Sequence, residues 1–175
     1  ELQLIARKTW KYFDELFEER YNWLSPDNYQ VSPSNVTANR TSPTNIGLQL
    51  LSTLTARDMG YIGIIEFIDR VDKVFGTMDK LQRWNGHFYN WYNTRTLEVL
   101  NPQYVSTVDS GNLLAYLIVL KNGLKDITDA PIISKTNFNG LLDTAKLAEL
   151  EFEEYNCPQT IEQWKQLTWR IKDII

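Results

Sequence analysis

Six aromatic residues lie close together between positions 84 and 104, interspersed with amides and charged groups. The aromatic residues are Trp84, Phe88, Tyr89, Trp91, Tyr92 and Tyr104, and the polar ones are Asn85, His87, Asn90, Asn93, Arg95 and Glu98. A sugar ring presents flat C–H faces edged by hydroxyls, and Tyr and Trp combine an apolar body with a polar tip. The stretch therefore predicts a carbohydrate-binding surface. The alternative is a loop whose aromatic residues form a small core of their own.

Three further charged residues outside this stretch are candidates for the same surface. Asp27 lies in a Ser-Pro-Asp-Asn sequence and is either a turn residue or a ligand-binding carboxylate. Arg40 either holds a loop by pairing with Asp27 or Asp109, or contacts the ligand itself. Asp109 is either the N-cap of a buried helix or a carboxylate that binds a sugar hydroxyl. The predicted substrate-binding residues are Asp27, Asn28, Arg40, Trp84, His87, Tyr89, Asn90, Trp91, Tyr92 and Asp109.

Several other chemistries are not supported by the sequence. His87 is the only histidine, and no metal-ligand spacing surrounds it, so neither a metal nor a cofactor is expected. The net charge of -4 argues against a nucleic-acid partner. No apolar run reaches the roughly 18–20 residues that span a bilayer, so we expect no membrane insertion by this segment. The lone Cys157 cannot form an internal disulfide. No catalytic residue is identified, since glycoside chemistry needs two carboxylates at a separation that sequence does not give.

Hydrophobic periodicity predicts six helices that position these residues. They cover residues 2–20, 43–59, 64–83, 110–122, 137–155 and 160–175. The first, third and fifth are amphipathic, whereas the second and fourth are apolar on nearly all sides. This alternation favours a ring of helical hairpins with wet outer helices and buried inner helices over a plain antiparallel bundle. A globular bundle in which the second and fourth helices are central is the alternative.

Two long connections, residues 21–42 and 84–109, each lead from an outer helix to an inner one. In an up-and-down ring both would lie at the same end, beside the N-termini of the inner helices, where unpaired N–H groups carry a partial positive charge. Residues near positions 40 and 90 are therefore predicted to be neighbours. The second connection also has the pattern of a β-hairpin, residues 87–92 against 94–100, that turns near Asn93.

Four segments resemble the cyclic β-1,2-glucan synthases, in the glucoamylase-like region in the middle of those large proteins. They are Asn22–Asn28, Arg40–Leu48, Gly86–Tyr92 and Tyr104–Leu113, and the resemblance ends at about Gly123. The resemblance implies an all-α chain that forms about half of an (α/α)6 toroid. The length of 175 residues predicts a single domain, and the helical patterns at both ends of the sequence suggest a fragment of a larger multidomain protein. The resemblance places residues 1–123 in the toroid and leaves residues 124–175 as additional helices.

The resemblance carries functional expectations as well. It implies a membrane-bound bacterial glucan synthase or transglycosylase whose soluble regions lie on the cytoplasmic face of the inner membrane. Within it, this chain would help to bind a β-linked glucan or glucooligosaccharide and would be inactive alone, with the catalytic glutamates elsewhere. The alternative is a non-catalytic helical module that contacts neighbouring domains of the same polypeptide.

Overall fold

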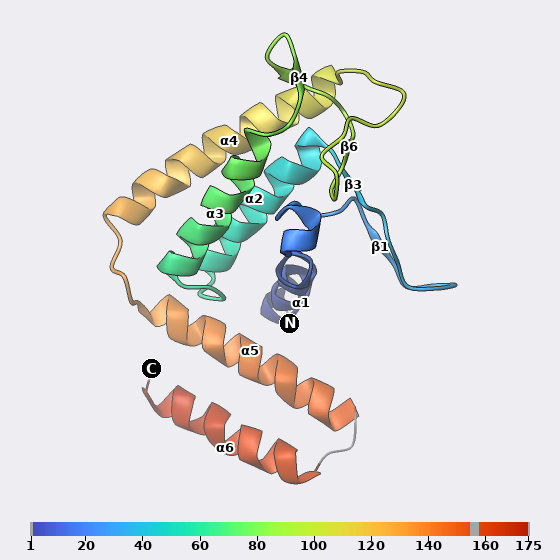
Figure 1. Ribbon diagram of the computed structural model, residues 1–175. Coiled ribbons are helices and arrows are strands. Elements are labelled where there is room, and N and C mark those ends of the chain that lie inside the picture. The colour runs from blue at the N-terminus through green and yellow to red at the C-terminus, as the bar shows by residue number, and fades with distance from the viewer. Residues whose placement is uncertain (1, 155–157, 175) are drawn as a thin grey trace.

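The computed structural model describes residues 2–154 and 158–174, and it is built mainly from helices (Figure 1). Four of them alternate in direction along the chain: α1 (Leu2–Glu15), α2 (Pro43–Asp58), α3 (Ile64–Met78) and α4 (Thr107–Thr128). Helix α2 packs against the other three. Helices α2 and α4 run side by side in the same direction, and their N-termini lie at one end with the long loops (Figure 1). The predicted ring arrangement of outer and inner helices is confirmed for these four helices.

Local signals explain where the two inner helices begin. Ser42 caps α2, since its Oγ accepts a hydrogen bond of 3.2 Å from the Asn45 N–H, and Pro43 occupies the first turn. Ser106 caps α4 in the same way, accepting from the Asp109 N–H at 3.1 Å. The N-cap reading of Asp109 is therefore wrong, because α4 begins three residues earlier than predicted. Asp109 lies in the first turn, where a carboxylate stabilises the helix dipole.

Two of the outer helices are shorter than predicted. Helix α1 ends at Glu15 and is followed by a 3₁₀ turn, Glu19–Tyr21, after which Asn22 and Trp23 take positive φ angles and redirect the chain. Helix α3 ends at Met78, because Arg83 and Trp84 enter a strand instead of a further helical turn.

Six two-residue strands organise the long loops. They pair as β1 (Tyr29–Gln30) with β2 (Val36–Thr37), β3 (Arg40–Thr41) with β6 (Tyr92–Asn93), and β4 (Arg83–Trp84) with β5 (His87–Phe88), all antiparallel. The predicted hairpin is thus only partly right. Its reversal after Asn93 exists, with the Asn93 N–H donating to Glu98 O and the Leu100 N–H to Trp91 O, each at 2.9 Å. Only the start of its first arm, His87–Phe88, pairs instead with β4, through an Asn85–Gly86 turn in which both residues have positive φ.

Helices α2 and α4 pack closely because each offers a glycine to a large side chain of the other. A Cβ on Gly47 would overlap the ring of Tyr116, and a Cβ on Gly123 would lie 2.6 Å from Leu54 Cδ2. The core lies beneath this pair, and the helices α1 to α4 and the loops all contribute buried side chains to it: Trp10, Leu24, Ile46, Leu50, Phe67, Val74, Tyr92 and Leu120. The buried α2 matches the prediction.

Helix α4 departs from the prediction of an element buried on all sides. Only Leu113 and Leu120 are buried, whereas Leu114 and Ile118 are 61% and 52% exposed. The reason is that α2 covers one side of α4 and no described element covers the opposite one.

The last two helices, α5 (Lys135–Glu154) and α6 (Pro158–Ile174), form a hairpin at the end away from the long loops (Figure 1). Helix α5 packs against α1, with hydrogen bonds from Arg7 Nε to Thr144 Oγ1 at 3.0 Å and from Lys11 Nζ to Glu151 at 3.3 Å. The fifth helix, one of the predicted additional helices, therefore packs on the first outer helix. Tyr155 and Ile175, the predicted ends of these helices, and Cys157 lie outside the described residues.

None of the helices in the described residues is both long and apolar enough to cross a membrane.

Candidate functional site

The two long loops meet at the N-terminal end of the inner helices. Strands β3 and β6 join them, with Arg40 opposite Asn93 and Thr41 opposite Tyr92. The N-terminal ends of α2 and α4 are also linked, because Asn112 Nδ2, in the second turn of α4, donates to Thr44 Oγ1, in the first turn of α2, at 3.1 Å. The prediction that residues near positions 40 and 90 are neighbours is thus confirmed. One surface is built from both loops and both helix termini.

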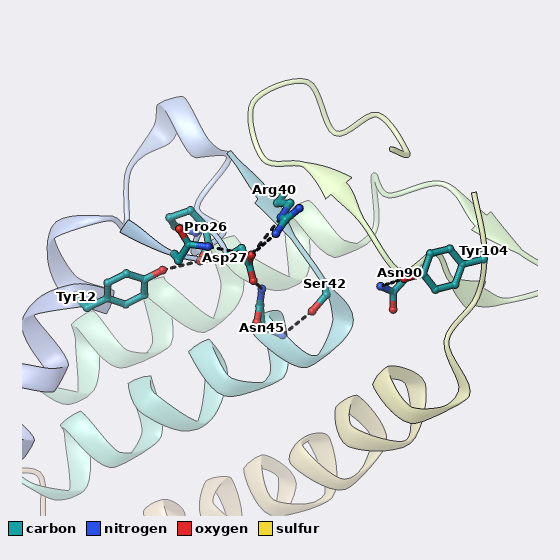
Figure 2. A network of polar contacts seen from close by, with 9 residues as sticks. Tyr12, Pro26, Asp27, Arg40, Ser42, Asn45, Asn90 and Tyr104 are labelled. Atoms are coloured by element: carbon teal, nitrogen blue, oxygen red, sulfur yellow. Dashed lines mark hydrogen bonds and ion pairs between the residues drawn. The ribbon is translucent and has the colours of Figure 1, made fainter. Parts of the chain in front are cut away.

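Asp27 and Arg40 form the polar centre of the first loop (Figure 2). The Arg40 guanidinium donates to Asp27 Oδ2 from Nε at 3.1 Å and from Nη2 at 2.9 Å. Asn45, in the first turn of α2, donates to Asp27 Oδ1 at 3.2 Å, and the Asp27 N–H donates to Arg40 O at 2.7 Å. Arg40 therefore pins the loop, as one of the two readings expected. Asn28 lies beside this pair, 3.2 Å from Asp27 Oδ2, and is exposed.

A hollow of about 350 Å³ opens next to Asp27. Its lining combines aromatic rings, a carboxylate and amides with two apolar contacts: Tyr12, Phe13, Ser25, Pro26, Asp27, Asn28, Tyr29, Asn45 and Leu48. The volume falls within the range of small-molecule pockets, and a few polar groups on an apolar wall are typical of them. Tyr12 and Asn45 were not predicted from sequence, and Tyr29 was expected on this loop face but not among the substrate-binding residues. The signal for Asn45 was its place in the first turn of a capped helix, two residues after Pro43.

Asn90 is a buried amide that connects the second loop to α4. In the amide orientation that gives both of its polar atoms complementary partners, Nδ2 donates to Asp109 Oδ2 while Oδ1 accepts from Trp91 Nε1 and the Tyr104 hydroxyl, each at 2.8 Å. The link to Tyr104 is visible in Figure 2. Asn90 thereby holds the side chains of Trp91, Tyr104 and Asp109 in fixed positions.

The indole of Trp91 completes a continuous path between the two carboxylates. The Arg40 guanidinium lies over its ring, 4.6 Å from the centroid, as in a cation–π pair. The path therefore runs from Asp27 through Arg40, Trp91 and Asn90 to Asp109. Each member is held by its neighbours, so the polar groups of the two loops have fixed positions relative to one another.

The predicted aromatic residues divide into exposed and buried ones. Trp84 is 55% exposed and faces His87 across the β4–β5 hairpin, and Tyr104 is also exposed. Trp91 and Tyr89 are half-buried, and Tyr89 packs on the core. Tyr92, in contrast, is fully buried. Its hydroxyl donates to Gln82 O and accepts from the Tyr89 N–H, both at 2.7 Å. The prediction that Tyr92 faces a ligand is wrong, because the β3–β6 pairing turns its ring into the core.

The geometry suits recognition of a polyhydroxylated ligand. Exposed rings offer flat apolar faces, and Asp27, Asn28, Asn45 and Asp109 offer hydrogen-bonding groups near two helix N-termini. Within residues 2–154 and 158–174, no three His, Cys, Asp or Glu side chains are grouped to hold a metal ion.

Burial in this region has a consequence at high pH. Burial raises the pKa of Tyr92 to about 12, and burial together with the Asp27 charge raises the pKa of Tyr12 to about 12. The folded pKa values exceed the unfolded value of 10.0, so the neutral phenols stabilise the fold fully below pH 10. That stabilisation, about 3 kcal/mol for Tyr92, is lost as the pH rises toward 12.

We therefore expect alkaline unfolding between about pH 10 and pH 12. Circular dichroism and tyrosinate absorbance should change together, and a Tyr92→Phe variant should have a shallower dependence on pH. Independent ionisation of all nine tyrosines near pH 10 with retained helical signal would contradict this expectation.

Comparisons with known proteins give three findings. A family model described as "Protein of unknown function (DUF3131)" matches residues 4–147. The cyclic beta-(1,2)-glucan synthase NdvB of Rhizobium meliloti (strain 1021) is 43% identical over 155 residues, which is 88% of this chain but 6% of that protein. A glucoamylase-like crystal structure from Bacteroides fragilis NCTC 9343 superposes with a TM-score of 0.55 at 22% identity, covering 65% of this chain and 28% of the other. The resemblance to the glucan synthase family is thus confirmed in sequence, and the toroid-type arrangement in fold.

Proposed function

The chain belongs to the family described as "Protein of unknown function (DUF3131)", and from this premise we propose that it is part of a carbohydrate-active enzyme and helps to bind a β-linked glucan on its loop face. The 43% sequence identity with a cyclic beta-(1,2)-glucan synthase supports a β-linked glucan as the ligand. The fold shared with a glucoamylase-like protein is consistent with it. Because the chain spans 6% of the length of the synthase that it matches, the activity of the whole protein is part of the proposal.

One observation carries the proposal: the pairing of β3 with β6 gathers both loops around the N-termini of α2 and α4. Exposed Trp84 and Tyr104 supply flat faces for sugar rings. The hollow beside Asp27 has room for a small ligand unit, with Tyr29 on its wall and Asn45 at the helix end. A glucan chain bound along this face would displace water from the aromatic rings and pack its apolar faces on them. Its hydroxyls would form hydrogen bonds with the carboxylates.

The proposed ligand-contacting residues are Asp27, Asn28, Trp84, His87, Trp91, Tyr104 and Asp109, joined by Tyr29 and Asn45. Arg40 and Asn90 act as positioning residues, because their polar atoms are engaged with Asp27, Trp91, Tyr104 and Asp109. Tyr89 and Tyr92 support the loop from below. This division refines the sequence prediction into a surface layer and a supporting layer.

Titration calorimetry with β-1,2-linked glucooligosaccharides tests the proposal, on this chain and on the longer protein that we propose carries it. We expect Trp84→Ala and Asp27→Asn each to weaken binding about 5- to 30-fold, or about 1–2 kcal/mol, because each removes one direct contact. Trp169→Ala is the matched control, since Trp169 is 66% exposed on α6, away from the loop face, and its loss should leave affinity unchanged. Equal affinities in all three variants would rule out the loop face as the binding site.

The remaining expectations fit this proposal as parts of it. Residues 1–123 supply an arc of the toroid and residues 124–175 supply additional helices. The catalytic acid and base come from other segments of the polypeptide, so this chain alone is catalytically weak or inert. A parent protein at the cytoplasmic face of the bacterial inner membrane remains a prediction.

A further inference from the structure

The chain segment that leads to Asp27 begins at a strained turn. Asn22 and Trp23 have φ angles of 51° and 63°, in the left-handed region that residues with a side chain seldom adopt. In a residue as bulky as tryptophan, such a conformation persists only where the surrounding structure enforces it. The chain then passes through buried Leu24 and Ser25 and reaches the hollow at Asp27. The direction of this turn therefore decides where the Asp27 carboxylate lies.

Buried side chains of two helices hold the turn. Gln49, in the middle of α2, is 1% exposed and bonds the segment at two points. Its Nε2 donates to Trp23 O at 2.7 Å, and its Oε1 accepts from the Ser25 N–H at 2.8 Å. From α3, Thr77 Oγ1 donates to Asn22 O at 2.7 Å. Because this buried segment belongs to neither a helix nor a strand, its backbone groups need other partners, and the two side chains provide them.

We propose that Gln49 is a positioning residue of the glucan site, because it fixes the backbone of residues 23–25 and thereby the place of Asp27. This inference rests on the proposed function and adds the residue of α2 that shapes the approach to the hollow. An amide suits this position, since the same group must donate to a carbonyl and accept from an N–H. Asn45, one turn earlier on α2, donates to Asp27 Oδ1. One face of the helix therefore holds both the backbone and the carboxylate of the segment.

Two substitutions of similar size separate positioning from packing. Gln49→Met keeps the length of the side chain and removes both hydrogen bonds. Gln49→Glu keeps them at pH 5, because burial favours the protonated carboxyl group, which donates to Trp23 O and accepts from the Ser25 N–H. In titration calorimetry at pH 5, we expect Gln49→Met to bind β-1,2-linked glucooligosaccharides about 10-fold more weakly than wild type and Gln49→Glu to stay within about 3-fold. A residue with only a structural role would lower the melting temperature and leave the affinity of the folded protein unchanged.

A matched pair of buried threonines provides a milder test. Thr77→Val removes the hydrogen bond to Asn22 O, whereas Thr53→Val removes one of 2.9 Å to Gln49 O within α2. Both threonines are buried and valine has nearly the same shape, so the two variants change packing to a similar degree. We expect Thr77→Val to weaken glucan binding about 3-fold and Thr53→Val to leave it unchanged, since only the first bond reaches the turn.

Hydrogen exchange of the Ser25 N–H, followed by NMR, examines the turn without any sugar. We expect this amide to exchange at least about 10-fold faster in Gln49→Met and at the wild-type rate in Gln49→Glu at pH 5. The comparison is made at a temperature well below the melting temperature of each variant, so that global unfolding does not contribute.

Three results would overturn the proposal. The first is wild-type affinity in both Gln49→Met and Thr77→Val, and the second is unchanged exchange of the Ser25 N–H in Gln49→Met. The third is a Gln49→Glu variant that folds at pH 5 and binds glucan as weakly as Gln49→Met. If the wild-type chain and the longer protein bound no glucan, the proposed function would fail, and exchange of the Ser25 N–H would still show whether Gln49 fixes the turn.

Discussion

Replacing Tyr92 with alanine should lower the free energy of unfolding by about 4 kcal/mol, the largest effect that we expect from a single side chain. The ring is fully buried where the two long loops meet, so its removal leaves a cavity beneath both. The hydroxyl also forms hydrogen bonds with Gln82 O and the Tyr89 N–H, and both backbone groups would lose this partner. Urea denaturation followed by circular dichroism measures the loss.

Tyr92→Phe separates the two contributions. It keeps the ring and removes only the hydroxyl, so we expect a loss of about 1–3 kcal/mol from the two unpaired backbone groups. Trp84→Ala serves as the exposed comparison and should change stability by less than about 0.5 kcal/mol. If Tyr92→Ala were no more harmful than Trp84→Ala, the burial of Tyr92 and the loop pairing built on it would both be wrong.

The second large effect should come from Gly140→Ala, with a loss of about 1–3 kcal/mol. A Cβ on Gly140 would overlap the backbone carbonyl of Gly60, in the α2–α3 turn, and would lie 2.7 Å from Met59 O. Backbone atoms cannot rotate aside as a side chain can, so α5 must move away from the turn. We expect faster amide hydrogen exchange in α5 and α6 while α2 and α4 keep their protection.

Gly76→Ala is the control with the opposite sign. Gly76 lies in the exposed part of α3, and a Cβ there meets nothing within 4 Å. Alanine favours the helix over glycine, so this variant should gain about 0.5–1 kcal/mol. Equal stabilisation by both substitutions would show that α5 does not dock on the α2–α3 turn as described.

The order and direction of the first four helices could be predicted because the evidence is local. Ser42 and Pro43 mark the start of α2, and hydrophobic periodicity distinguishes α2 and α4 from α1 and α3. The Asn85–Gly86 pair is also a local signal for a tight turn, but the predicted helix to residue 83 and the predicted reversal near Asn93 did not use it. The position of α5 could not be predicted, since it depends on a contact between two distant glycines.

The candidate site was predictable in location and less so in detail. Chain direction alone places residues near positions 40 and 90 at one end. Which aromatic side chain faces solvent depends on strand register, because neighbouring residues of a strand point to opposite sides. Trp91 and Tyr92 are adjacent and equally suited to a sugar, yet the register with Thr41 buries Tyr92. The role of Asn90 requires knowledge of three partners from different segments.

The close glycine contacts between α2 and α4 have a consequence for the kinetics of recognition. Helices α2 and α4 approach each other closely at their glycines and are joined near their N-termini by the hydrogen bond between Asn112 and Thr44, so they form a rigid support under both loops. The loops therefore lose most of their conformational entropy when the chain folds. Binding of a ligand then costs little further loop entropy. Related oligosaccharides that differ in affinity should accordingly differ in their dissociation rate constants and have similar association rate constants.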